Sequence, residues 1–164
     1  MKVTMIAAVA ANGVIGTGKG GLPWKLPRDI EHFRQYTAGR HLLVGRATYL
    51  EMVGWFQDRT PIVVSRTTTR LPDYPLVVAS VEAGIDLARD RGETELIVSG
   101  GGTIYRLAMP LATRLVLTEV KQEAVGTVRF PEVDERQWRE VESEDFPADG
   151  ENESAMRMVT LGRR

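Results

Sequence analysis

Asp29 is the residue whose type and position best suit chemistry on a bound ligand. It lies in the first turn of a helix expected over residues 27–36, where the helix dipole favours a carboxylate, and that structural role alone often explains an aspartate. However, Asp29 follows Leu26 by three residues and precedes Phe33 by four, which places it on or beside the apolar stripe of the helix. A carboxylate there is partly buried, at a cost in free energy unless it is hydrogen-bonded, and no basic residue lies at helical spacing on the stripe. A ligand with paired N–H donors would be a suitable partner.

A run of three glycines, Gly100 to Gly102, directly follows an expected strand and precedes an expected helix. Glycines at this position let another backbone or a phosphate approach closely, and the start of a helix favours an anion. The spacing is not the dinucleotide pattern G-x-G-x-x-G, and a tight strand-to-helix turn is the structural alternative. The triple glycine is therefore a candidate phosphate site that needs support from other residues.

Two strand ends each supply an arginine and a hydroxyl, Arg46 with Thr48 and Ser65 with Arg66. Ligands of open α/β sheets usually bind in the crevice at the carboxyl ends of the strands. Taken singly, each arginine is more typical of a solvated surface charge. Together with the triple glycine they could hold the phosphates of a dinucleotide, and a guanidinium suits a 2′-phosphate.

The loop from Asn12 to Trp24 is long, rich in glycine and follows an apolar strand. It contains no phosphate-loop pattern, and it could be only a flexible connection. Long loops within compact domains are often lids or binding loops, and Ile15 in so flexible a stretch would suit contact with a flat ligand. We therefore treat this loop as a candidate lid.

Short apolar runs alternate with helical patterns over the first two-thirds of the chain, which predicts a mostly parallel sheet with helices on both faces. Strands are expected at residues 3–11, 41–45, 61–65, 76–79 and 95–99, and helices at 27–36 and 81–91, the second with Ser80 as N-cap and Gly92 at its end. Three further strands, at 114–121, 138–146 and 155–161, have no clear helix between them and indicate an antiparallel edge, with a hairpin loop at 148–153. No composition break divides the chain, so we expect one domain over residues 1–164.

The composition excludes several classes of function. The net charge of −1 provides no footprint for nucleic acid or membrane binding. There is no cysteine, and the two histidines, His32 and His41, have no partner at metal-ligand spacing, so we expect no metal site and no Ser-His-Asp triad. The apolar N-terminal run is too short to span a membrane and has no convincing cleavage region after it, so a cytoplasmic protein is expected.

Taken in order along the chain, these segments resemble the dihydrofolate reductase family over nearly the whole sequence. The resemblance rests on stretches 6–10, 13–16, 22–27, 44–48 and 100–105, on Asp29 with Phe33, and on Phe130-Pro131. It implies an α/β fold with a central, mostly parallel eight-stranded sheet, an antiparallel C-terminal edge strand and about four flanking helices.

The resemblance also implies a substrate site. Asp29 is similar to the family's single active-site carboxylate, which hydrogen-bonds the pterin 2-amino group and N3. Thr118 resembles the threonine that supports this carboxylate, and Trp24 the tryptophan that helps to hold a water near it. Arg59 resembles the arginine that binds the α-carboxylate of the glutamate tail. The remaining residues that would line the substrate are Ile6, Ala7, Ala8, Ile30, Phe33, Met52 and Phe56.

The cofactor implied by the resemblance is NADPH. Gly100 to Gly102 would meet the pyrophosphate, with a cis peptide bond between Gly100 and Gly101, whereas Arg46 and Thr48 would meet phosphates and Ser65 and Arg66 the 2′-phosphate. The full set of residues expected around the cofactor is Ala8, Ile15, Gly16, Leu22, Gly45, Arg46, Ala47, Thr48, Ser65, Arg66, Ser99, Gly100, Gly101, Gly102, Thr103, Ile104 and Tyr105.

The family's reaction transfers a hydride from NADPH to C6 of dihydrofolate while N5 is protonated, with water as the expected proton donor. Asp29 then orients the pterin and favours protonation electrostatically. The product, tetrahydrofolate, serves one-carbon metabolism and thymidylate synthesis. The expected partners are dihydrofolate and antifolate inhibitors, and the expected state is a monomer that binds neither nucleic acid nor membrane.

Three other interpretations stay open at this point. A reductase of the same fold acting on a riboflavin-pathway pyrimidine would be expected to lack the pairing of Trp24 with Asp29. A non-catalytic nucleotide-binding domain would need none of Asp29, Thr118 and Arg59, and a structural module would leave the long glycine loop unexplained. All three are less consistent with these residues than a dihydrofolate reductase is.

Overall fold

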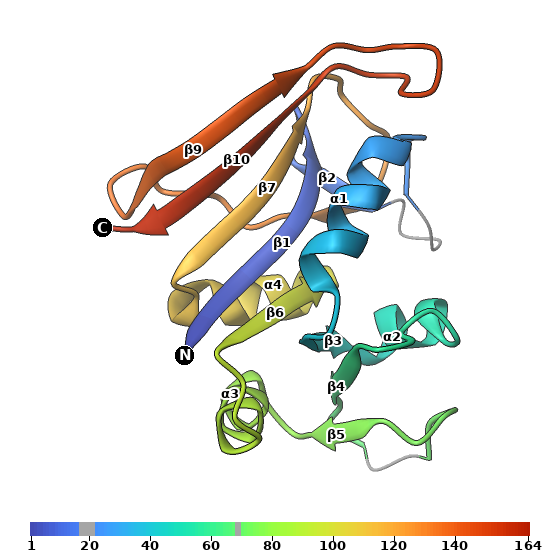
Figure 1. Ribbon diagram of the computed structural model, residues 1–164, viewed down its shortest axis with the longest axis vertical. Helices are drawn as coiled ribbons and strands as arrows, with labels where there is room; N and C mark the ends of the chain where they lie inside the picture. The colour runs from blue at the N-terminus through green and yellow to red at the C-terminus, as the bar shows by residue number, and fades with distance from the viewer. Residues whose placement is uncertain (17–21, 68–69) are drawn as a thin grey trace.

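The computed structural model describes residues 1–16, 22–67 and 70–164, and within them a central sheet of eight strands (Figure 1). The strands of this sheet are β1 (Lys2–Ala10), β3 (His41–Gly45), β4 (Thr60–Val64), β5 (Leu76–Val78), β6 (Glu95–Gly100), β7 (Arg114–Val120), β9 (Trp138–Phe146) and β10 (Met156–Arg163). The helices are α1 (Pro27–Thr37), α2 (Arg46–Met52), α3 (Val81–Asp90) and α4 (Gly102–Ala108), and the short 3-10 turn η1 (Met109–Leu111) follows α4.

The strand order across the sheet is β5-β4-β3-β6-β1-β7-β10-β9. The six strands β5, β4, β3, β6, β1 and β7 are parallel to one another. Strand β10 runs antiparallel to both β7 and β9. The predicted α/β fold, with eight strands, an antiparallel C-terminal part and four α-helices, is confirmed. The edge itself is formed by β9, and the C-terminal strand β10 lies one position inside it (Figure 1).

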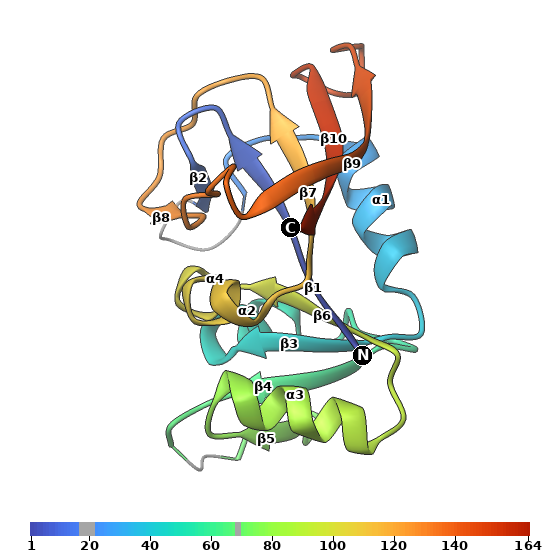
Figure 2. The same ribbon diagram turned by 90° about the vertical axis from the view of Figure 1, so that its left-hand side faces the viewer.

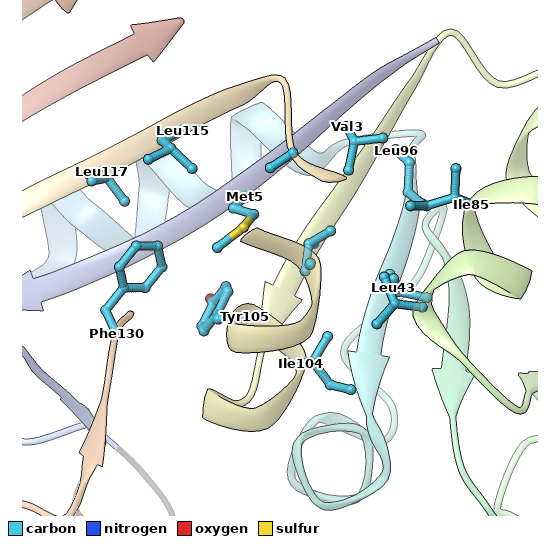
Figure 3. Close-up of a cluster of buried hydrophobic side chains, with 14 of the residues drawn as sticks. Val3, Met5, Leu43, Ile85, Leu96, Ile104, Tyr105, Leu115, Leu117 and Phe130 are labelled. Atoms are coloured by element: carbon cyan, nitrogen blue, oxygen red, sulfur yellow. The ribbon is translucent and has the colours of Figure 1, made fainter. Parts of the chain in front are cut away.

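Alternation of side chains along the strands divides the core between the two faces of the sheet. On β3 and β6, Leu43 and Val98 face one way, and Leu42, Val44 and Ile97 face the other. The first face is covered by α3 and α4, and its core is shown in Figure 3. The second face is covered by α1 and α2, as the turned view also indicates (Figure 2).

The helix boundaries follow the local signals in the sequence. Helix α1 begins with Pro27 at its first position and ends at Thr37. The Ser80 side chain caps α3 by accepting a hydrogen bond from the Ala83 N–H at 3.0 Å, and Gly92 beyond its end has a φ of +83°. The hairpin loop between β9 and β10 is present as expected.

A second, two-stranded sheet was not anticipated from the sequence. Strand β2 (Val14–Gly16) pairs antiparallel with β8 (Val128–Arg129), which ties the start of the candidate lid to the segment before Phe130. Residues 17–21 of that loop lie outside the described residues. No helix in the described ranges is long and apolar enough to cross a membrane.

Glu93, between α3 and β6, joins the starts of two central strands. Its carboxylate accepts hydrogen bonds from the His41 N–H at 3.1 Å, from Arg40 Nη1 at 2.9 Å and from the Thr94 N–H at 3.0 Å. The Arg91 Nε–H donates to His41 Nε2 at 2.9 Å, so His41 Nδ1 carries the proton of the neutral ring and donates to Glu93 at 3.0 Å. Burial alone would raise the pKa of Glu93, but these hydrogen bonds outweigh it and lower the pKa to about 2.

Replacing this carboxylate should destabilise the fold in a pH-dependent way. Because the folded pKa of about 2 lies below the ordinary value of 4.5, the stabilisation is present above pH 4.5 and is lost as the pH falls toward 2. We expect Glu93→Gln to lower the free energy of unfolding at pH 7 by about 2 kcal/mol, and the difference from wild type to shrink at acid pH. Urea unfolding from pH 7 to pH 3 measures this, with Glu123→Gln, an exposed glutamate, as the control. A difference that does not vary with pH would contradict the assignment.

Candidate active site

Asp29 lies in the first turn of α1 and is partly buried against the sheet, as its position on the apolar stripe predicted. Burial raises the pKa of Asp29 above its ordinary value. A hydrogen bond with the Thr118 side chain and the nearby His32 ring act in the opposite direction, and burial is the largest of the three effects. The carboxylate therefore lies in a poorly solvated place with a neutral hydroxyl as its support, which is typical of a group that acts on a ligand.

The sheet register explains why Thr118 meets Asp29. Strand β7 pairs with β1 so that Thr118 lies opposite Ala8, and Val116 lies opposite Ile6. Ile6 and Val116 belong to the core beneath α1 and α2, and Thr118 is 1% exposed. Strands β1 and β7 thus form the floor on which α1 places the carboxylate.

Trp24 lies beside the floor formed by β1 and β7, in a separate small hydrophobic core. It is buried with Leu26 and Val120, and Ala8 packs against this group. The Trp24 Nε1–H is enclosed and has no hydrogen-bond partner within the described part of the chain. A buried donor without an acceptor is unusual, so this N–H remains available to a small polar molecule.

The other predicted substrate residues are distributed unevenly. Ile30 is 44% exposed, and Phe33 and Met52 are half-buried on the face shared by α1 and α2. Phe56 belongs to the core and is only 7% exposed. Ala7 requires a correction, because its side chain packs against the core of the opposite face, as the two-residue period of a strand dictates. The side chain of Ala7 therefore does not share the face that carries Ile6.

Arg59 is buried and already hydrogen-bonded within the protein. Its Nε–H donates to Thr37 Oγ1 at 2.8 Å and its Nη2 to the Arg34 carbonyl at 2.7 Å, and its Nη1 contacts the Phe56 carbonyl and Asp58. The guanidinium lies 4.3 Å from the centre of the Trp55 ring. Of the five N–H hydrogens of arginine, one on Nη2 has no partner among these four contacts.

Trp55 is a residue that the sequence analysis missed. Its ring stacks on Phe33 at 5.3 Å between centroids and also supports Arg59. It thereby links two of the predicted substrate residues. Trp55 follows α2 in an irregular segment, so no periodicity could have identified its position.

The glycine turn is shaped so that no side chain fits in it. The Gly100–Gly101 peptide bond is cis, as the family resemblance implied, and Gly100 has a φ of +110°. A Cβ on Gly101 would lie 3.0 Å from Thr48 Oγ1, and one on Gly102 would lie 2.9 Å from Val128 Cγ1. The turn brings bare backbone to the surface, which is the property that binding of a phosphate requires.

The glycine turn adjoins the start of α2. A Cβ on Gly45 would lie 3.1 Å from Ile104 Cγ1 and 3.7 Å from the Gly101 nitrogen. Both α2 and α4 have a glycine as N-cap residue, Gly45 and Gly101, and no side-chain cap, so backbone N–H groups of their first turns are available to an anion. The structure therefore brings one predicted set of cofactor residues together: Arg46, Ala47, Thr48, Gly101, Gly102 and Thr103.

The remaining predicted cofactor residues lie at the margins of this set. Arg66 is exposed after β4, and the Ser65 hydroxyl donates to the Thr67 carbonyl at 2.9 Å. Leu22 is 51% exposed, and Ile15 and Gly16 form part of the β2–β8 pair. Arg66 is therefore an accessible cation two residues beyond the end of β4.

Tyr105 and Ser99 lie beneath the glycine turn. The Tyr105 hydroxyl donates to the Ile6 carbonyl at 2.6 Å, and burial, with the nearby Asp29 charge, raises the pKa of Tyr105. Ser99 occupies a bulge where β6 shifts register against β3, and its enclosed Oγ has no partner in the described ranges. Tyr105 thus supports the turn from below.

Two cavities in the described part of the chain are lined by residues other than Asp29. One of about 650 Å³ lies on the opposite face, over β7 and β10 and beneath residues 130–138. Another of about 430 Å³ reaches Phe56 and Arg59 from the side of Tyr74. Among the described residues no group of three or more acidic or histidine side chains converges as a metal site.

Comparisons with known proteins agree on one family. A sequence profile described as dihydrofolate reductase matches residues 2–163. Dihydrofolate reductase type 3 of Salmonella typhimurium is 35% identical over 164 residues, which is 100% of this chain and 99% of that protein. Dihydrofolate reductase of Neisseria gonorrhoeae is 40% identical over 143 residues, which is 87% of this chain and 86% of that protein. The structure of dihydrofolate reductase from Enterococcus faecalis complexed with NADP(H) and RAB-propyl has a TM-score of 0.91 and 30% sequence identity. The match covers 99% of this chain and 96% of that chain.

The partly buried carboxylate should cost the fold stability. Because the folded pKa of Asp29 is raised above the ordinary 3.8, the folded state holds more protons than the unfolded state between these two values, and stability falls as the pH rises through that window. We expect Asp29→Asn to raise the free energy of unfolding at pH 7 by about 1 kcal/mol. Near pH 4 the free energies of unfolding of the variant and the wild type should be equal. Urea unfolding at both pH values measures this, with the exposed Asp145→Asn as the control. A variant that is less stable at pH 7 would contradict the prediction.

Proposed function

Because the chain belongs to the dihydrofolate reductase family and is an NADPH-dependent oxidoreductase acting on dihydrofolate, we propose that Asp29 is the group that holds the pterin ring. The observation that carries this proposal is the partly buried carboxylate supported by Thr118. Two carboxylate oxygens match the paired N–H donors of the pterin, at N3 and at the 2-amino group. The Thr118 hydroxyl keeps these oxygens in one orientation.

In this mechanism Asp29 acts on charge and orientation and is not the direct proton donor. The pterin gains a proton at N5, delivered by water, as the hydride reaches C6, and the negative charge on Asp29 favours the protonated ring. The nicotinamide of the bound cofactor supplies that hydride. Trp24, whose enclosed N–H has no partner among residues 1–16, 22–67 and 70–164, serves as the donor that holds a water close to the carboxylate.

The glycine turn and the starts of α2 and α4 form the proposed cofactor site. Its bare backbone admits the pyrophosphate where a Cβ would collide with Thr48 or Val128, so the chain is well matched to this group. Arg46 and Thr48 would bind phosphate oxygens. Ser65 and Arg66 would bind the 2′-phosphate, since a guanidinium matches its oxygens in a bidentate manner.

The glutamate tail of the substrate is assigned to Arg59. The buried guanidinium keeps one Nη2 hydrogen without a partner in the part of the chain that the structure describes, and it is held rigidly by Thr37 and the Arg34 carbonyl. A preorganised cation of this kind suits a carboxylate. Ile30, Phe33 and Met52 would contact the ring system between the two charged groups.

Several further properties belong to the same proposal. Residues 1–164 act as a single domain, a monomer in the cytoplasm that binds antifolate inhibitors at the pterin site and does not bind nucleic acid. Support comes from the continuous eight-stranded sheet and the low net charge. The pyrimidine-reductase and non-catalytic interpretations lose their basis, because the profile and the named relatives all belong to the dihydrofolate reductase family.

Removing the charge of Asp29 should abolish most of the activity. We expect Asp29→Asn to lower kcat/KM for dihydrofolate by at least about 100-fold, because the charge that orients the pterin and favours its protonated form is lost. Oxidation of NADPH, followed by its absorbance, measures the rate, and cofactor fluorescence checks that NADPH still binds. Asp145→Asn should behave as wild type. An active Asp29→Asn enzyme would exclude the proposed role.

Arg66 should determine the preference for the phosphorylated cofactor. We expect Arg66→Ala to weaken NADPH binding by about tenfold, because a charge-assisted hydrogen bond to the 2′-phosphate is removed, and to leave NADH binding unchanged. Titration of intrinsic fluorescence with each cofactor measures both affinities. Arg89→Ala, which removes an exposed arginine on α3, is the matched control. Equal weakening for both cofactors would place Arg66 elsewhere than at the 2′-phosphate.

A further inference from the structure

Helix α1, which carries Asp29, begins without a cap of its own. Its N-cap position is Leu26, whose side chain cannot accept a hydrogen bond, and its first residue, Pro27, has no N–H. The N–H groups of Asp29 and Ile30 both donate to the Leu26 carbonyl, at 3.0 and 3.2 Å. The Arg28 N–H is the remaining donor of the first turn that requires a partner.

Asn152, in the loop between β9 and β10, supplies that partner. Its Oδ1 accepts a hydrogen bond from the Arg28 N–H at 3.0 Å, across 124 residues of sequence, and Asn152 is 4% exposed. An asparagine oxygen in this role satisfies the same need as an N-cap side chain, although it comes from a distant segment. Figures 1 and 2 both show this loop beside the start of α1.

Asp149 determines which end of the Asn152 amide faces the helix. Asp149 Oδ1 accepts from the Asn152 backbone N–H at 2.7 Å and from Asn152 Nδ2 at 3.0 Å. Because the amide nitrogen is a donor and is engaged by this carboxylate, the amide oxygen is directed toward Arg28. These hydrogen bonds, with one from the Glu151 N–H, lower the pKa of Asp149 to about 2, so it stays ionised.

The same loop also holds the side chain of Arg28. Arg28 Nη2 forms an ion pair with Asp149 Oδ2 at 3.2 Å, and the guanidinium lies 4.7 Å from the centre of the Phe146 ring. The residue that directly precedes Asp29 is therefore held by its backbone and by its side chain. Both contacts come from the β9–β10 hairpin.

We propose that Asn152, oriented by Asp149, is a positioning residue for the reaction, because it fixes the first turn of α1 from which Asp29 reaches Thr118. This inference rests on the proposed role of Asp29. The carboxylate is held at its side chain by Thr118 of β7 and at its backbone by the helix start, so a loosened first turn would displace it. The other titratable groups near it are His32 on α1 and Tyr105 on α4.

The test compares Asn152→Ala with Glu93→Gln. The second substitution removes a buried hydrogen-bonding carboxylate at the starts of β3 and β6, away from the start of α1. In the free enzyme, ¹³C NMR follows the titration of the Asp29 carboxyl group, and steady-state kinetics give KM and kcat for dihydrofolate. In Asn152→Ala the first turn frays and the carboxyl becomes more hydrated, so its pKa should move down toward the ordinary value. KM should rise about fivefold, while kcat changes less. Glu93→Gln should alter neither the titration nor KM.

A paired exchange provides a rescue. The double variant Asn152→Asp with Asp149→Asn keeps the net charge and again presents an oxygen to the Arg28 N–H, with the amide donor now on residue 149. It should restore both the Asp29 titration and KM toward wild type. A double variant that remains at the Asn152→Ala values would overturn the proposal.

The outcomes separate the two levels of inference. If Asp29→Asn stays active, the proposed function of Asp29 fails, whatever Asn152→Ala does. If Asp29→Asn is inactive, but Asn152→Ala lowers only the unfolding temperature and leaves the titration and KM unchanged, as Glu93→Gln does, then Asn152 is merely structural and only the positioning role fails.

Discussion

Holding one carboxylate in a poorly solvated place, with no ion pair to it among the described residues, is the constraint on which the site depends. Burial raises the pKa of Asp29, and the groups that oppose this effect, a Thr118 hydroxyl and the His32 ring, are the smaller influences. Water would solvate the charge better, so the rest of the structure must keep Asp29 in place. The parallel strands β1 and β7 supply a rigid floor, and α1 supplies the direction of approach. The free energy for this arrangement comes from the two apolar cores on either side of the sheet.

The glycine turn is under a second constraint, which is that its backbone must stay free of side chains. This is the opposite of the constraint on Asp29, whose side chain must be enclosed. In the proposed cofactor site a phosphate approaches backbone N–H groups of this turn, and side chains at residues 100–102 would compete for the same space. Both constraints are met on neighbouring strands, because β6 lies directly beside β1 in the sheet. The order of strands therefore brings the floor beneath Asp29 and the glycine turn close together in the sheet, and the carboxyl ends of such strands are where ligands of α/β sheets usually bind.

Local patterns predicted the parts of this protein that local physics controls. The apolar runs located the strands, and the stripe on residues 27–36 placed Asp29 against the core. The orientation of Ala7 could also have been inferred, since alternation from Ile6 sends its side chain to the other face. The three-residue strand β2 and the two-residue strand β8 are too short to show a period. Trp55 and Asn152 act through partners that only the folded chain brings near, so their types carry no signal of their function.

The dependence of α1 on the β9–β10 loop has a consequence for how the chain matures during synthesis. Helix α1 and the floor formed by β1 and β7 contain only residues up to Val120. The oxygen that completes the helix start belongs to Asn152, which is synthesised 124 residues after its donor Arg28. Contacts between such distant segments form late, because the loop that they close is long. A nascent chain can assemble its parallel strands and its glycine turn while the first turn of α1 is still frayed. The first turn of α1 is then completed only after the β9–β10 hairpin has been synthesised and has folded.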